Sequence, residues 1–222
     1  MIVFQSRRHI QRILLLLVLQ VGIVSDQLYA AETPTQTSSK FKLLVVGDSL
    51  SAAYRLQQQE GWVSLLQNMW YDEQRKIEIV NAAISGETTD GALSRLPRLL
   101  DQHQPSHVFI ELGGNDGLRG NQIAGMKKNL REMVTMAKEA GAEVILQDME
   151  IPPNYGKRYT RMFADSFDEI AEEEEVAIIP FFLEDIALNK KLMQKDGIHP
   201  NAEAQTLIAE YMHMKLSPLI TD

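Results

Sequence analysis

The chain has 222 residues, no cysteine and a formal net charge of -8 at pH 7. The absence of cysteine excludes disulfides, thiolate nucleophiles and zinc–thiolate sites. The acidic balance argues against binding to nucleic acid through its phosphates, which requires clustered Lys and Arg. We therefore expect no nucleic-acid partner.

Residues 1–30 follow the plan of a secretory signal peptide. Three arginines within residues 7–12 precede the apolar stretch Ile13–Val24, and Ala30 and Ala31 provide small residues for cleavage. The stretch is shorter than the about 20 apolar residues that span a bilayer, which favours a cleaved signal over an uncleaved anchor. Cleavage after Ala30 removes three arginines and one aspartate, which changes the net charge from -8 to -10. We expect export, with no stable membrane insertion after cleavage.

The remaining chain divides into a short lead-in and one domain. Residues 31–40 are rich in Ser, Thr, Gln and Pro, which predicts a flexible segment. Residues 41–222 suit a single domain with one core, and this length with the acidic surface makes a monomer the default expectation. Short apolar runs alternate there with segments of helical period, which indicates a parallel sheet covered on both faces. The expected strands are Lys42–Val46, Ile77–Ala82, His107–Leu112, Glu143–Gln147 and Val176–Pro180.

Apolar residues spaced three and four apart predict the covering helices. They lie within Trp62–Met69, Leu93–Leu100 and Met126–Ala137, and these stripes belong to the core. The acidic run Glu172–Glu175 is typical of the solvated end of another helix. A last helix is expected to start near Pro200, which suits a first-turn position. The result is a three-layer α/β/α domain, in which ligands bind beyond the carboxyl ends of the strands.

Ser49 lies in a good position for a nucleophile, in the sequence GDSLS directly after the first expected strand. Its structural alternative is a helix cap, since serine is a favoured N-cap residue. The chain contains neither of the Gly-rich phosphate-binding spacings. It also lacks the G-x-S-x-G elbow, which disfavours the α/β-hydrolase family.

Asp196 and His199 stand three residues apart in the sequence DGIHP near the C-terminus. This spacing allows the carboxylate to meet one ring nitrogen while the other accepts a proton from Ser49. Histidine suits the base role because its ordinary pKa of about 6.5 lies near working pH. The alternative is a turn in which the aspartate caps locally and the histidine is incidental.

Two further strand ends carry glycine beside small polar groups. Gly86 follows the second expected strand, and Asn115 lies in GGND after the third. The backbone N–H groups of Gly86 and Ser49 and the amide of Asn115 would supply three donors to an oxyanion, each worth about 10²–10³ in rate. Each glycine alone is more often a tight turn, but together they predict a site.

These segments resemble those of the SGNH (GDSL-type) hydrolases, which are named for a Ser, a Gly, an Asn and a His. The resemblance extends over essentially the whole chain after the signal. It implies a flavodoxin-like fold, a Ser49–His199–Asp196 triad, Gly86 and Asn115 as oxyanion donors, and no cofactor. It also implies a periplasmic esterase and thioesterase that acts on small acyl esters, thioesters and lysophospholipids. The sequence departs from the family at Ala53, where glycine is expected.

The leaving group limits the substrates. Thiolates and phenolates, with conjugate-acid pKa values of about 8.5 to 10, depart with little proton donation, whereas amines must be protonated. We therefore expect thioesters and aryl esters to react well and peptides poorly. Gly117 and Leu118, in the glycine-containing segment 117–123, are expected to contact the acyl group as a lid-like loop. Ile151 and Pro152 are expected to line its other side.

A metal site is one alternative to this hypothesis. Asp148, Glu150 and Glu111 also lie near strand ends, and with His107 they suggest a rival metal site, but no paired ligand spacing supports it and no metal is expected. His107 is interpreted as a partly exposed residue at a strand start. Two functional alternatives are an esterase that removes acetyl groups from carbohydrate and a catalytically idle domain that binds a lipid or a partner.

Overall fold

The computed structural model describes residues 40–221. The predicted signal at 1–30 and all but the last residue of the lead-in at 31–40 lie outside the described residues. Five strands form one sheet of order β2-β1-β3-β4-β5, and every neighbouring pair is parallel. The strands are β1 (Phe41–Gly47), β2 (Ile77–Asn81), β3 (His107–Glu111), β4 (Glu143–Gln147) and β5 (Ala177–Ile179).

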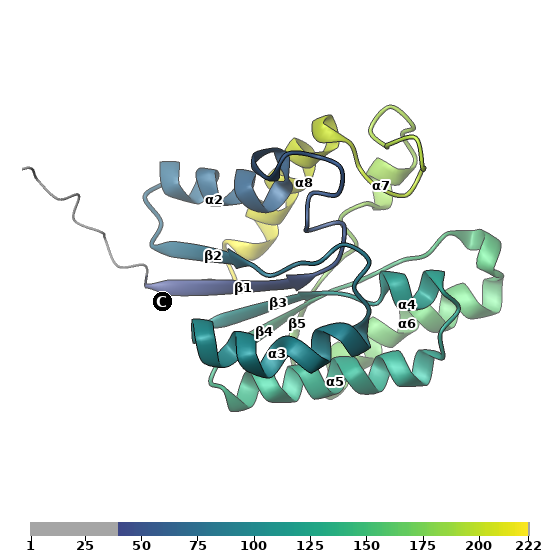
Figure 1. Ribbon diagram of the computed structural model, residues 1–222, viewed down its shortest axis with the longest axis horizontal. Helices are drawn as coiled ribbons and strands as arrows, with labels where there is room; N and C mark the ends of the chain where they lie inside the picture. The colour runs from purple at the N-terminus through teal and green to yellow at the C-terminus, as the bar shows by residue number, and fades with distance from the viewer. Residues whose placement is uncertain (1–39, 222) are drawn as a thin grey trace, which may run out of the picture. The chain divides into compact units, whose positions relative to one another are not determined.

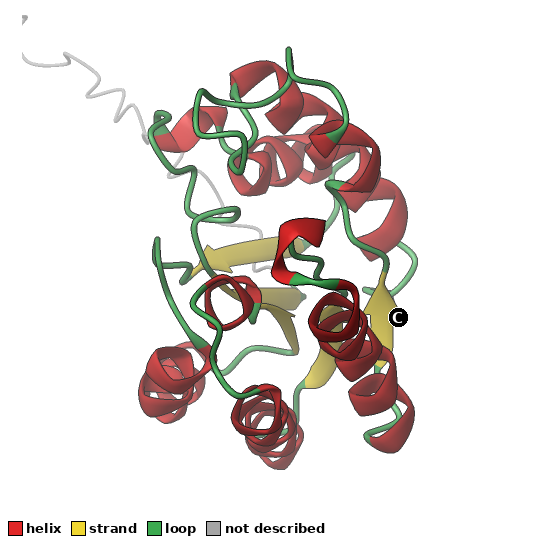
Figure 2. Ribbon diagram, turned by 90° about the vertical axis from the view of Figure 1, so that its right-hand side faces the viewer, coloured by secondary structure: helices red, strands yellow, loops and turns green. Residues whose placement is uncertain are grey.

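Helices cover both faces of this sheet, as predicted. The helices α2 (Trp62–Asp72) and α8 (Ala202–Leu216) pack together on one face. The other face carries α3 (Thr89–His103), α5 (Ile123–Glu139) and α6 (Lys157–Glu173), so that the sheet forms the middle layer (Figures 1 and 2). Shorter elements are η1 (Gln58–Glu60), α4 (Gly114–Leu118), η2 (Pro153–Tyr155) and α7 (Glu184–Ala187).

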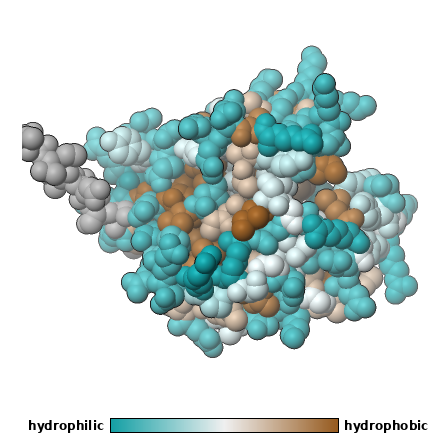
Figure 3. All heavy atoms as spheres, in the orientation of Figure 1, coloured by the Kyte–Doolittle hydropathy of each residue, from teal (hydrophilic) through white to brown (hydrophobic). Residues whose placement is uncertain are grey.

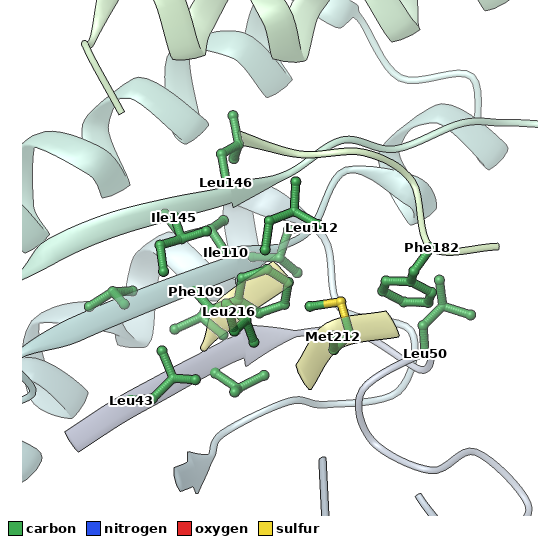
Figure 4. Close-up of a cluster of buried hydrophobic side chains, with 14 of the residues drawn as sticks. Leu43, Leu50, Phe109, Ile110, Leu112, Ile145, Leu146, Phe182, Met212 and Leu216 are labelled. Atoms are coloured by element: carbon green, nitrogen blue, oxygen red, sulfur yellow. The ribbon is translucent and has the colours of Figure 1, made fainter. Parts of the chain in front are cut away.

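The core lies on both sides of the central strands. β3 is buried along its whole length, and Leu43 to Val46 of β1 are fully buried. Figure 4 shows side chains of these strands together with Met212 and Leu216 of α8. Burial of a large apolar side chain contributes about 1.5–3 kcal/mol, so this cluster fixes the relative positions of β1, β3 and α8.

The surface has a different character. In the face seen in Figure 3, hydrophilic residues dominate the periphery, and hydrophobic ones show between them toward the middle. Between residues 40 and 221, no helix combines the length and the apolar character needed to cross a membrane.

The strand predictions are confirmed to within one residue at every end, each predicted helical segment lies inside an observed helix, and two details are wrong. Pro200 does not begin the last helix. Asn201 caps α8 instead, because its side chain accepts a hydrogen bond from the N–H of Ala204 at 3.1 Å. His107 is not partly exposed but buried at 4 % exposure, since β3 is an interior strand rather than an edge strand.

The topology brings several loops to one edge of the sheet. Because all five strands are parallel, their carboxyl ends meet at that edge. The last residues of β1 and β3, Gly47 and Glu111, are register partners, so the loop of Ser49 and the loop of Asn115 start side by side. The three adjacent strands β2, β1 and β3 therefore deliver Gly86, Ser49 and Asn115 to neighbouring positions.

Candidate active site

Ser49 lies in a tight turn after β1. The Oδ1 atom of Asp48 accepts the N–H of Leu50 at 3.0 Å, and the carbonyl of Asp48 accepts the N–H of Ala52 at 3.0 Å. The side chain of Leu50 points into the core beside Phe182 and Met212 (Figure 4). The turn is thus anchored from below while Ser49 stays half-buried at the edge of the sheet.

A chain of hydrogen bonds joins Ser49 to the C-terminal turn. Ser49 Oγ lies 2.9 Å from His199 Nε2, and His199 Nδ1 lies 3.0 Å from Asp196 Oδ2. Because an ionised carboxylate only accepts, Nδ1 carries the imidazole proton and Nε2 is free to accept the proton of Ser49. The structure thus brings together three residues, of which Ser49 and His199 are 150 positions apart.

The carboxylate of Asp196 is held by more than the imidazole. Its Oδ1 atom accepts the backbone N–H groups of Ile198 and His199, both at 3.0 Å. Partial burial alone would raise the pKa of Asp196, but these two N–H groups and the imidazole together lower it to about 2. Asp196 is therefore ionised at neutral pH and fixed in orientation.

The imidazole is also held from its flat side, by residues that the sequence analysis did not single out. The ring of Tyr54 lies 4.3 Å from that of His199, at an interplanar angle of 37°. The amide of Gln194 donates to the carbonyls of Tyr54 (2.9 Å) and Pro200 (3.0 Å), which ties the two loops together. No motif spacing marks Tyr54 or Gln194, because their role depends on a contact between distant loops.

The predicted oxyanion donors lie at the same edge. Among the hydrogen bonds of the described residues, the N–H groups of Ser49 and Gly86 have no acceptor. Gly86 has φ of +80°, which favours glycine, and its carbonyl accepts from Arg119 at 2.9 Å. The amide of Asn115 donates one hydrogen to Asp48 Oδ2 at 2.9 Å, which leaves its second N–H available.

The positions of Asn115 and Gly86 are linked by a neighbouring carboxylate. Asp116 accepts both the backbone N–H and the hydroxyl of Thr89, each at 2.9 Å, where α3 begins. Two residues before Asn115 lies Gly113, which has φ of +110°. A Cβ at Gly113 would lie 2.9 Å from the ring of Phe167, so this position has no room for a side chain. Sequence reasoning missed Asp116, although its place next to Asn115 was a signal.

The predicted lid-like loop is more ordered than expected. Gly117 and Leu118 belong to α4, and the hydroxyl of Tyr155 donates to the carbonyl of Leu118 at 2.8 Å. A Cβ at Gly117 would lie 2.8 Å from Ile151, so the two predicted substrate-binding segments touch each other. Ile151 is buried, whereas Pro152 is exposed. The segments are adjacent to Asn115 but packed rather than free.

Ala53, where the family resemblance leads one to expect glycine, adopts φ of +54°. Its methyl group is buried, and a Cβ on Gly61 would lie only 2.7 Å from it. The alanine is therefore accommodated because glycine stands at position 61. This packing lies behind the nucleophile turn and does not touch the Ser49–His199–Asp196 chain.

The residues of the rival metal site are dispersed. His107 and Glu111 occupy opposite ends of β3. Glu111 is fully buried and accepts the hydroxyl of Ser51 at 2.7 Å, whereas Asp148 follows β4 and Glu150 is exposed. These four residues do not share one coordination sphere.

Asp148 is nevertheless electrostatically unusual. Its Oδ1 atom is buried and has no hydrogen-bond partner in the described part of the chain. Burial first, and then the charge of Asp168, raise the pKa of Asp148 to about 7, against a smaller opposing effect of the Met149 N–H. The folded protein therefore binds a proton here that the unfolded chain, with a pKa near the ordinary value of about 3.9, has released.

The sign of this linkage gives a testable result. Between about pH 4 and pH 7 the folded state holds more protons, so the free energy of unfolding falls as the pH rises. Asp148→Asn removes the effect. We expect the free energy of unfolding of Asp148→Asn, relative to that of wild type, to increase by about 1–2 kcal/mol from pH 5 to pH 8, because solvent partly screens this carboxyl group.

Urea unfolding at several pH values measures this difference. Asp165→Asn, an exposed change on α6, is the matched control and should follow the wild-type pH dependence. Parallel curves for wild type and Asp148→Asn would contradict the assignment of the shift to Asp148.

Comparisons with known proteins agree with this geometry. The model of the GDSL-like lipase/acylhydrolase family matches residues 45–207. The chain is 46 % identical over 175 residues to an arylesterase of Vibrio mimicus, covering 79 % of this chain and 88 % of that protein. It is 47 % identical over 178 residues to the thioesterase 1/protease 1/lysophospholipase L1 of Escherichia coli strain K12, covering 80 % and 84 %.

A solved structure is similar over the same region. It is that of the psychrotrophic esterase EstA from Pseudoalteromonas sp., inhibited by monoethylphosphonate, with 48 % identity and a TM-score of 0.80. The match covers 82 % of this chain and 100 % of that one. With the family model and these relatives in agreement, the chain belongs to the GDSL-like lipase/acylhydrolase family, the SGNH hydrolases.

Proposed function

We propose that this protein hydrolyses carboxylic esters and thioesters through an acyl-enzyme intermediate on Ser49. The observation that carries the proposal is the continuous hydrogen-bond chain from Ser49 Oγ through the His199 ring to Asp196. Such a chain activates a serine hydroxyl, which is otherwise a weak nucleophile. The names of the two curated relatives, an arylesterase and a thioesterase/lysophospholipase, support the same reaction class.

The reaction proceeds in two halves. Ser49 Oγ attacks the carbonyl carbon while His199 Nε2 takes its proton, and Asp196 stabilises the imidazolium that forms. The oxyanion receives hydrogen bonds from the N–H groups of Ser49 and Gly86 and from the Asn115 amide. His199 then returns the proton to the departing alcohol or thiol. Water repeats the sequence on the acyl-enzyme and releases the carboxylic acid.

We infer that the acyl donors are aryl esters, acyl-CoA thioesters and lysophospholipids. Thiolates and phenolates leave with little help from His199, which favours these substrates over peptides. We further propose that residues 1–30 direct the protein to the periplasm and that it acts as a monomer. The arginine-rich start of the chain and its apolar stretch support export, and the single-domain length supports the monomer.

The reaction is tested by steady-state hydrolysis of p-nitrophenyl esters from acetyl to palmitoyl and of acyl-CoA thioesters. We expect turnover on medium or long chains, and Ser49→Ala should lower kcat by on the order of 10⁴-fold or more. Ser94→Ala, an exposed serine on α3, is the control and should keep wild-type activity. Turnover of the acetyl ester alone would favour the carbohydrate esterase, and no turnover by folded protein would refute hydrolysis.

The acyl side of the site gives a second prediction. Because Ile151 lies against Gly117, two residues beyond Asn115, we expect Ile151→Phe to shorten the space for the acyl chain. Each excluded methylene costs about 0.8 kcal/mol, so the loss of two should lower kcat/KM for the longest esters about tenfold relative to butyryl ester. The chain-length profile measures this shift.

Leu207→Phe adds the same ring at an exposed position of α8, so this control variant should keep the wild-type chain-length profile. Thermal unfolding of both variants separates a lost fold from a changed site. A folded Ile151→Phe variant with the wild-type chain-length profile would show that Ile151 does not line the acyl site.

A further inference from the structure

A pair of carboxyl groups lies directly beneath the nucleophile turn and has no part in the reaction described above. Glu111 is fully buried at the end of β3, and Asp48 is 3 % exposed beside Ser49. Glu111 Oε2 accepts the Ser51 hydroxyl at 2.7 Å and the Asp48 N–H at 3.2 Å. This approach is possible because position 47 is glycine, where a Cβ would lie 2.7 Å from Glu111 Oε2.

The Asp48 N–H bonds Glu111 Oε2, so the two buried carboxyl groups lie close together. Two ionised carboxylates in this arrangement would repel each other, which favours one proton on the pair. Full burial first, and then the charge of Asp48, raise the pKa of Glu111 well above its ordinary value. The second oxygen of Glu111, Oε1, is buried and receives no donor from the described residues, which leaves it free to carry the proton. Glu111 is therefore the acid of the pair, and Asp48 is the carboxylate.

Asp48 accepts hydrogen bonds at both oxygens. Oδ1 receives the N–H of Leu50 at 3.0 Å, and Oδ2 receives the amide of Asn115 at 2.9 Å. Burial raises the pKa of Asp48 above its ordinary value, and the hydrogen bonds from Leu50 and Asn115 oppose that rise by stabilising the ionised form. The same carboxylate thus connects the nucleophile turn with the oxyanion donor on α4.

The contact with Asn115 decides which way its amide points. The C=O and NH₂ ends of a carboxamide have nearly the same shape, so packing alone does not distinguish them. A carboxylate does, because the carbonyl end facing Asp48 would set two acceptors against each other. With the NH₂ end held by Asp48, the second N–H remains for the substrate.

We propose that Asp48, whose backbone N–H is held by the buried Glu111, is a positioning residue that fixes the Asn115 amide with its free N–H directed at the oxyanion formed on Ser49. This inference rests on the proposed hydrolase function and adds two residues to it. Neither Asp48 nor Glu111 touches the substrate. Both act through Asn115 and through the turn that carries Ser49.

The first test is a kinetic double-mutant cycle on p-nitrophenyl butyrate with Asp48→Asn, Asn115→Ala and the double variant. An amide at position 48 cannot accept at both ends, so one donor, Leu50 N–H or Asn115, is left facing an NH₂ group. We expect Asp48→Asn to lower kcat about 10²-fold, the effect of losing one oxyanion donor, with little change in KM. In the Asn115→Ala background, Asp48→Asn should lower kcat by no more than about twofold.

Asp148→Asn is the matched control, because Asp148 also has a buried carboxyl oxygen at a strand end but forms no hydrogen bond with Asn115 in the described part of the chain. Any effect it has on kcat should persist in full in the Asn115→Ala background. If the effect of Asp48→Asn also persists in full there, Asp48 acts through the general fold and the proposal is overturned.

The second test does not depend on the stability of Asp48→Asn. Glu111→Gln reproduces the protonated acid, since its side chain is uncharged and its carbonyl can still accept from the Ser51 hydroxyl and the Asp48 N–H. We expect Glu111→Gln to keep kcat within about twofold and Glu111→Leu to lower it as Asp48→Asn does. Equal losses in the two Glu111 variants would overturn the shared-proton arrangement. An inactive wild-type protein would instead contradict the hydrolase function itself, so the two failures are distinguishable.

Discussion

The contact between Ser49 Oγ and His199 Nε2 is the interaction on which the rest of the site depends. It joins residues 150 positions apart, and a hydrogen bond of this kind weakens steeply with small displacements. The packing of α2 against α8 holds the two ends together, and the amide of Gln205 accepts the N–H of Trp62 at 2.9 Å between these helices. Closer to the imidazole, the Gln194 amide donates to the carbonyl of Tyr54, and the Tyr54 ring packs on His199, so these contacts also join the two loops. The nucleophile and the base are thus placed by the same layer of the fold.

The carboxyl edge of the sheet carries an unusual concentration of buried acidic groups. Isolated buried carboxylates are costly, and each one here is used differently. Asp116 accepts two hydrogen bonds from Thr89. Asp48 accepts hydrogen bonds from Leu50 and Asn115. Glu111 avoids the cost of a buried charge by remaining protonated. For Asp148, whose buried Oδ1 has no partner among the described residues, burial raises the pKa to about 7. Asp116, Asp48 and Glu111 fix the positions of the loops around Ser49. Their burial lowers the stability of the fold, but it holds the site in the geometry that the reaction needs.

The sequence predicted what depends on local pattern. Buried parallel strands are nearly continuous apolar runs, so β1 to β5 and their common edge were evident, and Ser49, Gly86 and Asn115 follow those strands directly. The sequence did not predict what depends on contacts between distant segments. His107 was misjudged because a strand start gives no sign of its place in the sheet, and the helix near Pro200 begins two residues later because Asn201 is the better cap. Tyr54, Gln194 and the Asp48–Glu111 pair became visible only once the loops were placed side by side.

Covalent labelling of the nucleophile tests the central claim most directly. A fluorophosphonate forms a stable adduct with a serine that a neighbouring histidine activates, and peptide mapping by mass spectrometry identifies the modified residue. We predict one adduct per chain, located on Ser49, and none on the folded Ser49→Ala variant. Folded wild-type protein that remains unlabelled, or a label that persists in Ser49→Ala, would contradict the assignment of Ser49, His199 and Asp196 as one catalytic unit.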